Sequence, residues 1–196
     1  MIKRCFDFVA SGAGILVLTP LLAVVAVIIK LDSPGPVFFR QARVGRNFVN
    51  FHIFKFRTMV IDAESRGAQI SSAGDPRITR LGTFLRKYKI DELPQLFNVF
   101  LGEMSLVGPR PEVPRYVEMF RGEYEEVLSV KPGITDFASL EYKDENDLLR
   151  GVADPEKVYI ETILPRKLAF SRRYLKERGF MTDFLLIIRT IMSLFR

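Results

Sequence analysis

The chain has 196 residues and contains only one cysteine, Cys5, and one histidine, His52. A single cysteine excludes an internal disulfide and a metal site made of cysteine ligands. A Ser-His-Asp triad would depend on His52, and nothing else in the sequence supports one. The chain also shows no internal repeat and no low-complexity segment, which excludes repeat architectures.

Acidic residues are also scarce, because 23 Asp and Glu stand against 29 Lys and Arg, giving a net charge of +6. A basic balance favours anionic partners, namely nucleic acid, anionic lipid headgroups or phosphorylated substrates. Mean hydropathy is positive although 27% of the residues are charged, so apolar and charged residues are segregated along the chain. No nucleic-acid recognition motif is present, and a long apolar segment argues further against that partner.

No charged residue occurs between Phe8 and Ile29. About 20 apolar residues in a helix cross the hydrocarbon core of a bilayer. The run is too long for the apolar part of a cleaved signal peptide, and no small-x-small cleavage site follows it. We therefore predict a membrane helix over residues 1–32 and a cytoplasmic catalytic domain over residues 33–196.

The apolar segment can insert in two ways. Pro20, preceded by Thr19, removes a backbone hydrogen bond near the middle of the run and bends the helix. Basic residues lie on both sides, including Lys3, Arg4 and Lys30. The positive-inside rule is satisfied at both ends only if the segment enters and leaves on the same face. A kinked spanning helix and a re-entrant helix both stay open on the residues alone.

The rest of the chain alternates short elements, which predicts an α+β, mainly helical fold with a small β-hairpin and amphipathic helices packed on a compact domain. Residues 61–74 are polar and predict a surface helix and loop. The expected elements are strands at Val37–Val44 and Phe48–Arg57, helices at Thr79–Tyr88, Asp91–Gly102, Val113–Glu126 and Glu156–Arg178, and a turn at Lys131–Thr135. Thr79 and Asp91 are the expected N-caps. Phe180–Arg196 is either an interfacial membrane helix or a core helix.

Two adjacent carboxylates, Asp91 and Glu92, lie at an expected helix start. The partial positive charge there favours an ionised carboxylate. An ionised aspartate can attack phosphorus and form an acyl-phosphate. Carboxylate and phosphate oxygens are also the ligands that Mg²⁺ prefers. The pair predicts either phosphate chemistry or a simple helix cap, and spacing alone does not choose between them.

Basic side chains surround this pair in the sequence. Lys55 and Arg57 point to one face of an expected strand, because side chains alternate along it. Arg77 precedes the acidic pair, and Arg86 lies just upstream of it. Arg110 stands between Pro109 and Pro111, so a stiff loop presents its side chain. A phosphate-binding role and an ordinary solvated surface are both compatible with these residues.

The chain resembles the bacterial sugar transferase family, the monotopic phosphoglycosyl transferases that use polyprenyl phosphate. The matching motifs lie at residues 3–7, 35–45, 55–59, 75–79, 91–99 and 108–112. The resemblance implies transfer of a sugar 1-phosphate from a UDP-sugar to undecaprenyl phosphate with release of UMP, the first membrane step of glycoconjugate synthesis. It makes Asp91 the nucleophile of a covalent phosphosugar intermediate and a Mg²⁺ ligand. It gives Glu92 a part in the second half-reaction, as a base toward the polyprenyl phosphate.

The resemblance also assigns substrate contacts and a membrane position. The assigned substrate-binding residues are Lys55, Arg57, Arg77, Arg86, Gln95, Arg110 and Lys143. The family's apolar segment is a re-entrant helix broken at a Ser-Pro pair, which Thr19 and Pro20 replace here. The expected location is the cytoplasmic face of the bacterial inner membrane, in contact with the lipid bilayer. The resemblance does not decide whether the chain forms a homodimer.

Two positions depart from the family pattern. Lys143 stands where a phosphate-binding arginine is often found, and Ser171 stands where an acid usually precedes Tyr174. Both changes bear on which sugar is transferred. A membrane-anchored binding or scaffold protein, in which the acidic pair only caps a helix, is the alternative function.

Overall fold

The computed structural model describes residues 2–63, 70–72, 74–143 and 145–194, and it is mainly helical with two small sheets. The predicted α+β class is confirmed at this level. The helices are α1 (Ile2–Asp32), α2 (Arg80–Lys87), α3 (Gln95–Leu101), α4 (Pro114–Met119), α5 (Arg121–Val127), α6 (Phe137–Glu141), α7 (Glu145–Leu148), α8 (Pro155–Val158), α9 (Leu164–Glu177) and α10 (Phe180–Ser193). The strands are β1 (Phe38–Val44), β2 (Asn50–Phe56), β3 (Ser105–Val107) and β4 (Gly133–Thr135).

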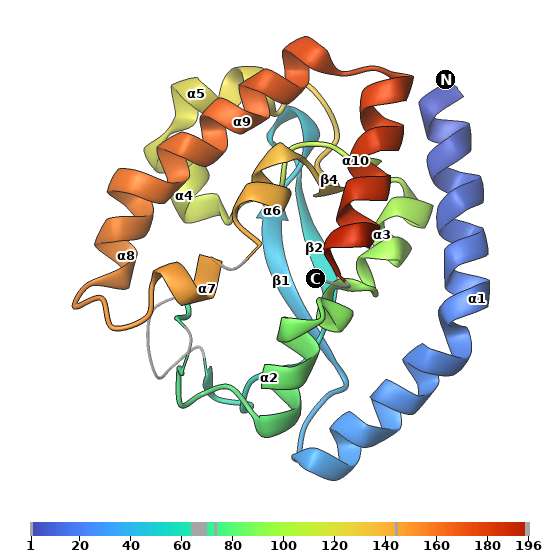
Figure 1. Cartoon of the computed structure of the whole chain (residues 1–196), viewed down its shortest axis with the longest axis vertical. Helices are drawn as coiled ribbons and strands as arrows, with labels where there is room; N and C mark the ends of the chain where they lie inside the picture. Colours follow the sequence, from blue (N-terminus) through green and yellow to red (C-terminus); the bar gives the residue numbers. More distant parts are fainter. Residues whose placement is uncertain (1, 64–69, 73, 144, 195–196) are drawn as a thin grey trace.

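The long apolar helix α1 runs along one edge of the molecule and bends partway along its length (Figure 1). Pro20 lies inside it, and the Thr19 hydroxyl donates a hydrogen bond to the Ile15 carbonyl oxygen, 2.7 Å away. A threonine that bonds back to its own helix bends that helix. Only 11% of the most apolar stretch of α1 is buried, so this is not the core helix of a soluble domain. Its length and composition suit membrane association.

Polar residues fasten the first half of α1 to the rest of the chain. The Arg4 guanidinium donates to the carbonyl oxygens of Val99 and Phe100 at the end of α3. The buried Asp7 carboxylate accepts hydrogen bonds from the Ser105 hydroxyl and the Leu106 amide at the start of β3. These contacts satisfy helix-end and strand groups that would otherwise be buried without partners. They hold α1 against the rest of the fold, while many of its apolar side chains stay exposed.

The predicted β-hairpin is present as antiparallel strands β1 and β2, with Phe38 opposite Phe56 and Val44 opposite Asn50. A short 3₁₀ turn at Arg46–Phe48 joins them. Phe56 is buried among Val25 and Ile29 of α1 and Leu85 of α2. The hairpin is therefore the element on which the second half of α1 and α2 both pack.

The second sheet was not anticipated. Residues 131–135 were predicted to be a turn, but Gly133–Thr135 forms β4 and pairs in parallel with β3. A Cβ atom on Gly133 would lie 2.1 Å from the Gly108 amide nitrogen, so only glycine permits this approach. The close crossing brings the start of the Pro109–Pro111 loop against β4.

Some helix boundaries differ from the prediction. The expected helix at Val113–Glu126 is divided into α4 and α5 at Phe120. The expected helix at Glu156–Arg178 contains a π turn at Tyr159–Ile163 directly before Pro165, whose missing amide hydrogen disturbs the regular ladder. The residues 61–74 that were predicted to be a surface helix and loop lie partly outside the described residues. In Figure 1, α10 runs beside the first half of α1, and several of its apolar side chains are exposed.

Candidate active site

The acidic pair lies in a 3₁₀ turn, Ile90–Glu92, between α2 and α3. The prediction that Asp91 caps α3 is wrong, because Pro94 occupies the N-cap position and α3 begins at Gln95. Proline has no amide hydrogen, so it cannot donate to the Ile90 carbonyl, and the helical ladder starts after it. Thr79 does cap α2, since its hydroxyl accepts a hydrogen bond from the Gly82 amide at 2.9 Å. The predicted helix end at Gly102 is also confirmed, with a φ of 88°.

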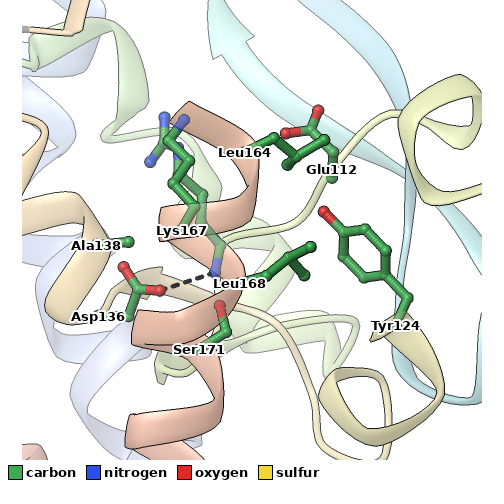
Figure 2. Close-up of a pocket in the computed structure, with 9 residues that line it drawn as sticks. Glu112, Tyr124, Asp136, Ala138, Leu164, Lys167, Leu168 and Ser171 are labelled. Carbon is green, nitrogen blue, oxygen red and sulfur yellow. Dashed lines mark hydrogen bonds between the residues drawn. The ribbon is translucent and has the colours of Figure 1, made fainter. Parts of the chain in front are cut away.

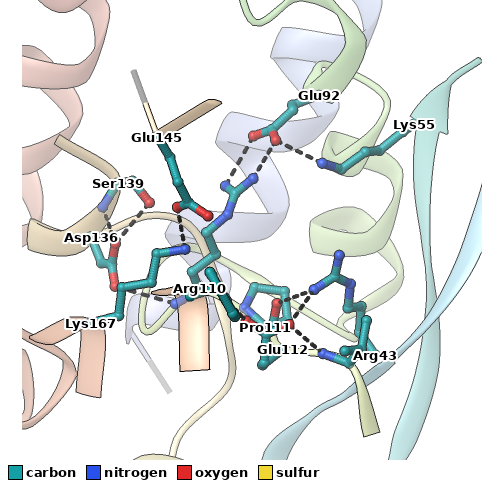
Figure 3. Close-up of polar contacts among 12 residues, drawn as sticks. Arg43, Lys55, Glu92, Arg110, Pro111, Glu112, Asp136, Ser139, Glu145 and Lys167 are labelled. Carbon is teal, nitrogen blue, oxygen red and sulfur yellow. Dashed lines mark hydrogen bonds and ion pairs between the residues drawn. The ribbon is translucent and has the colours of Figure 1, made fainter. Parts of the chain in front are cut away.

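Glu92 is the meeting point of two cations from distant parts of the chain (Figure 3). The Lys55 Nζ atom of β2 lies 2.8 Å from Glu92 Oε1. The Arg110 guanidinium holds the same carboxylate with two nitrogens, one of them 3.1 Å from Oε2. A forked guanidinium on a carboxylate fixes both position and orientation. Glu92 thus ties the hairpin, the acidic turn and the Pro109–Pro111 loop together.

Charges and burial set the protonation states in this cluster. Burial opposes ionisation of Glu92, but Arg110 and Lys55 together hold its pKa well below its usual range. Glu92 is therefore ionised and is a weak base in this arrangement. Burial lowers the pKa of Lys55, partly offset by Glu92. The Glu92 carboxylate is therefore occupied by its ion pairs with Lys55 and Arg110.

Asp91 differs sharply from its neighbour. Burial raises the pKa of its carboxyl group, against the influence of Lys55. Its Oδ1 atom is buried and has no hydrogen-bond partner within the described part of the chain. The Nε2 atom of Gln95, one helical turn further on, is also buried and lacks a partner there. Buried polar atoms without partners are rare in native proteins, and at a functional site they point to a ligand.

The Asp91 carboxylate is also the group that could hold a divalent cation. No cluster of three or more His, Cys, Asp or Glu side chains suited to a metal occurs among the described residues. Mg²⁺ needs few protein ligands, because it keeps several waters and takes oxygens from substrate phosphates. The unpartnered Asp91 Oδ1 atom fits that pattern, whereas Glu92 is occupied by its two cations.

The loop that carries Arg110 is held from both sides. Arg43 of β1 donates to the Pro111 carbonyl oxygen at 3.1 Å and to Glu112 Oε1 at 3.0 Å, and Tyr159 donates to the other Glu112 oxygen. On the far side, the buried Asp136 carboxylate accepts from the Arg110 amide at 3.3 Å and caps α6. The stiffness predicted for this loop therefore comes from Arg43, Glu112 and Asp136 as well as from the two prolines.

Two other predicted arginines lie on the side of α2. Arg86 is largely buried and donates to the Thr58 hydroxyl and the Ser71 hydroxyl, each at 2.8 Å. Burial lowers its pKa, although nearby Asp91 favours the charged form. Arg77 forms a forked ion pair with Asp75, with NH2 and Oδ2 2.6 Å apart. Arg86 is thus electrostatically coupled to the acidic turn, while Arg77 is paired to its own loop.

The structure does not bring two of the predicted substrate contacts to the acidic turn. Arg57 is buried and donates to the carbonyl oxygens of Ile29, Ser33 and Pro34. It therefore completes the end of α1 and the turn after it. Lys143 donates to the Ser193 carbonyl oxygen at the end of α10. Substrate contact by these two residues stays a prediction, and their present partners are structural.

A cavity of about 20 Å³ lies beneath the Arg110 loop and is lined by Asp136, Lys167 and Ser171, among others (Figure 2). This volume admits about one water molecule. Ser171, which replaces an acid expected from the family pattern, lines the same cavity as the buried carboxylate of Asp136.

Sequence reasoning missed residues that position the site. Asn98 is fully buried and joins α3 to β2 by accepting from the Phe54 amide and donating to the His52 carbonyl. It lies in the matched motif, but a single amide in an apolar helix gave no signal of a role. Glu112 ends the motif at residues 108–112, and no pattern in the sequence indicated its contacts. Its function depends on Arg43 and Tyr159, which are distant in the sequence.

These observations define a class of protein: a chain with an exposed apolar helix and an acidic turn in which Asp91 is buried and Glu92 is bound by Lys55 and Arg110. The comparisons agree with that class. A family model described as "Bacterial sugar transferase" matches residues 1–196. The chain belongs to the bacterial sugar transferase family.

Three relatives show how the family is named. The chain is 40% identical to a UDP-N-acetylgalactosamine-undecaprenyl-phosphate N-acetylgalactosaminephosphotransferase of Aeromonas hydrophila over 98% of its length and 43% of the relative. It is 34% identical to an Escherichia coli K12 protein and 35% identical to a Caulobacter vibrioides protein, both named UDP-glucose:undecaprenyl-phosphate glucose-1-phosphate transferase. The Escherichia coli match spans 97% of this chain and 39% of that relative, and the Caulobacter vibrioides match spans 98% of this chain and 69% of that relative. The chain thus spans less than half of two of these relatives, and their sugars differ.

Proposed function

We propose that the chain transfers a sugar 1-phosphate from a UDP-sugar to undecaprenyl phosphate and releases UMP. The observation that carries this proposal is the contrast within the acidic pair. Glu92 is neutralised by Lys55 and Arg110, while a buried oxygen of Asp91 has no partner among the described residues. An aspartate left available beside fixed cations is suited to attack a phosphate whose negative charge those cations offset.

The proposed reaction has two steps. An Asp91 carboxylate oxygen forms a bond to the sugar-bearing phosphorus of the donor, and the bond between that phosphorus and the bridging diphosphate oxygen breaks, which releases UMP. A phosphate oxygen of undecaprenyl phosphate then attacks the same phosphorus, and the Asp91 carboxylate leaves. The products are a free enzyme and undecaprenyl diphosphosugar. The two steps need no oxidant or reductant.

The surrounding residues have separate parts in this reaction. Arg110 and Lys55 offset the charge of the donor phosphates, and Glu92 holds both cations in place. The low pKa of Glu92 favours this positioning part over the part of a base. Gln95 offers an unpartnered amide donor to a substrate oxygen. A Mg²⁺ ion held by Asp91 would supply positive charge to the diphosphate and improve its leaving group.

The membrane position belongs to the same proposal. We infer that α1 enters and leaves the cytoplasmic face of the bacterial inner membrane as a re-entrant helix. The Thr19 hydrogen bond and Pro20 support a bend near the deepest point. Arg57 supports a fixed exit, because it binds three carbonyl oxygens where α1 ends. The acidic turn would then lie where a soluble donor and a lipid acceptor meet.

A panel of UDP-sugars tests the activity. We expect the full-length protein to release UMP with one class of donor in the presence of undecaprenyl phosphate. Asp91→Asn should lower that release by roughly a thousandfold or more, as loss of a nucleophile does in covalent catalysis. Asp154→Asn is the matched control, because asparagine caps helices as well as aspartate does. Undiminished release in Asp91→Asn would show that Asp91 is not the nucleophile, whereas no release by the parent protein with any donor would support the scaffold alternative.

A further inference from the structure

A large concave surface lies away from the acidic turn. It is a groove of about 700 Å³ between the start of α1, the start of α10, β3 and residues 129–131. None of Asp91, Glu92, Lys55 and Arg110 lines it. We call it the basic groove, because Arg4, Arg46, Lys131 and Arg178 all line it.

The acids of the basic groove are already engaged. Asp7 accepts from the Ser105 hydroxyl at 2.8 Å and from the Leu106 amide at 3.1 Å. Asp183 pairs with Lys3 and accepts from the Tyr174 hydroxyl at 2.9 Å. No other carboxylate from the described residues lines the groove. Asp183 is therefore ion-paired, whereas Asp7 keeps its charge and offsets the four cations in part, so the lining of the groove has a positive balance.

None of these four cations forms an ion pair with a carboxylate of the described residues. Arg46, Lys131 and Arg178 form neither an ion pair nor a side-chain hydrogen bond with any residue that the structure describes. Arg4 donates only to uncharged backbone carbonyl oxygens. Burial lowers the pKa of Lys131, and repulsion from Arg4 and Arg46 lowers it further, while attraction to Asp7 offsets part of that effect. An anion bound among these residues would relieve that repulsion.

The opposite wall of the groove is apolar. Phe6 of α1 meets Phe180 of α10 edge to face, with ring centroids 6.4 Å apart, and Phe184 stacks beside Phe180. All three side chains are exposed, and Phe180 is 71% exposed. They continue the outward-facing apolar surfaces of α1 and α10, which lie side by side in Figure 1. A soluble anion would leave this apolar wall exposed to water, whereas a bilayer lipid would cover it.

We propose that the basic groove binds an anionic phospholipid of the bilayer, with its headgroup phosphate among Arg4, Arg46, Lys131 and Arg178 and an acyl chain along Phe6, Phe180 and Phe184. The lipid is not a substrate, because the groove contains no reactive carboxylate. The polyprenyl acceptor must bring its phosphate to Asp91, so a second lipid phosphate site has a different occupant. The inference requires membrane association, and its choice of a lipid other than the acceptor rests on the proposed function.

Lipid retention by the full chain in detergent tests this proposal. Native mass spectrometry would compare phosphatidylglycerol with phosphatidylcholine of the same acyl chains. We expect the parent protein to retain phosphatidylglycerol preferentially, and Arg46→Gln/Lys131→Gln to weaken that retention by about 25-fold, at about fivefold for each basic residue near an anionic headgroup. Lys157→Gln/Arg166→Gln is the control, since both residues are exposed and neither lines the groove.

Each outcome decides the proposal. Selective loss in the groove variant supports it. Equal retention of the two lipids by the parent, or equal loss in the control variant, overturns it. Retention of undecaprenyl phosphate that falls in parallel with phosphatidylglycerol in the groove variant also overturns it, by making the groove the acceptor site. If the double variant does not fold, the exposed single change Arg178→Gln replaces it, with an expected loss of about fivefold. UMP release by the same samples separates failure of this proposal from failure of the transfer reaction.

Discussion

The acidic turn and the basic groove both gather cations, but they differ in what neutralises them. At the turn, Lys55 and Arg110 share the Glu92 carboxylate, and a neighbouring carboxylate oxygen has no partner among the described residues. In the groove, Arg46, Lys131 and Arg178 form no ion pair with a described residue, because Asp183 pairs with Lys3 and Asp7 bonds to uncharged donors. Paired cations hold a reactive group in place, whereas unpaired cations leave room for an anion. The same residue types thus support two different tasks.

Among the cations around the acidic turn, Arg110 provides the largest expected effect. Arg110→Lys keeps the charge but loses the planar fork that holds both Glu92 oxygens. We expect kcat/KM for UMP release to fall by roughly 10²- to 10³-fold, the range seen when one charge-stabilising donor is lost. Arg115→Lys is the matched control, because Arg115 is exposed and pairs with Glu156 on the surface. A fall in kcat/KM of less than threefold would contradict a role for Arg110 in the reaction.

The two carboxylates should respond oppositely in stability. Glu92→Gln leaves two cations without their acid, and breaking a buried pair costs about 3 kcal/mol of unfolding free energy. Asp91→Asn removes a buried carboxylate that lacks a hydrogen bond at one oxygen, so stability should stay the same or rise. Denaturant unfolding of both variants in detergent measures the difference. Equal destabilisation would show that Asp91 is as structurally engaged as Glu92.

Low pH should remove the contribution of Glu92 to the stability of the fold. Its folded pKa lies well below the ordinary value of 4.5, so the stability it adds is present above pH 4.5 and is lost as pH falls toward the folded value. The difference in melting temperature between the parent and Glu92→Gln should therefore shrink as pH falls below 4.5. Asp91 has a raised pKa and acts with the opposite sign, so Asp91→Asn should steepen the acid loss. A difference that does not vary with pH would contradict this account.

Substitution of Arg57 is expected to have the smallest effect. It tests whether this side chain has a structural role or contacts the substrate. Arg57→Lys loses part of the hydrogen bonding to Ile29, Ser33 and Pro34. We expect a loss of about 1–2 kcal/mol of stability with KM for the UDP-sugar unchanged within about twofold. A large rise in KM without a loss of stability would restore Arg57 to the substrate site. Thermal unfolding and steady-state kinetics on one preparation give both numbers.

Local chemistry explains why parts of the fold were predictable from the sequence. The charge-free run predicted α1, and the alternating side chains on both sides of residues 45–47 predicted the hairpin. Thr79 and Gly102 marked helix ends. The β3–β4 pair was missed because it depends on the close approach of Gly108 and Gly133, which are distant in sequence. The Asp91 cap was assigned wrongly because the effect of Pro94 on the helix start was underestimated.

The candidate site was predictable in its residue types but not in its connections. The motif around residues 91–95 and Arg110 indicated phosphate chemistry, and the structure brings Lys55 and Arg110 to Glu92. No pattern indicated that Glu92 would be fully engaged while Asp91 is not, because burial and pairing depend on three separate segments. For the same reason Arg57 was assigned to the substrate, although its position at the end of α1 gives it backbone partners. The groove cations escaped notice because they come from four unrelated parts of the chain.

The intact mass of the protein after incubation with donor alone tests the central claim most directly. With a productive UDP-sugar and no undecaprenyl phosphate, we predict release of about one UMP per active enzyme and a mass increase equal to one sugar phosphate, located on Asp91 by peptide mapping. Adding acceptor should remove the added mass. Protein that turns over with acceptor, yet neither gains this mass nor releases UMP with donor alone, would contradict the account.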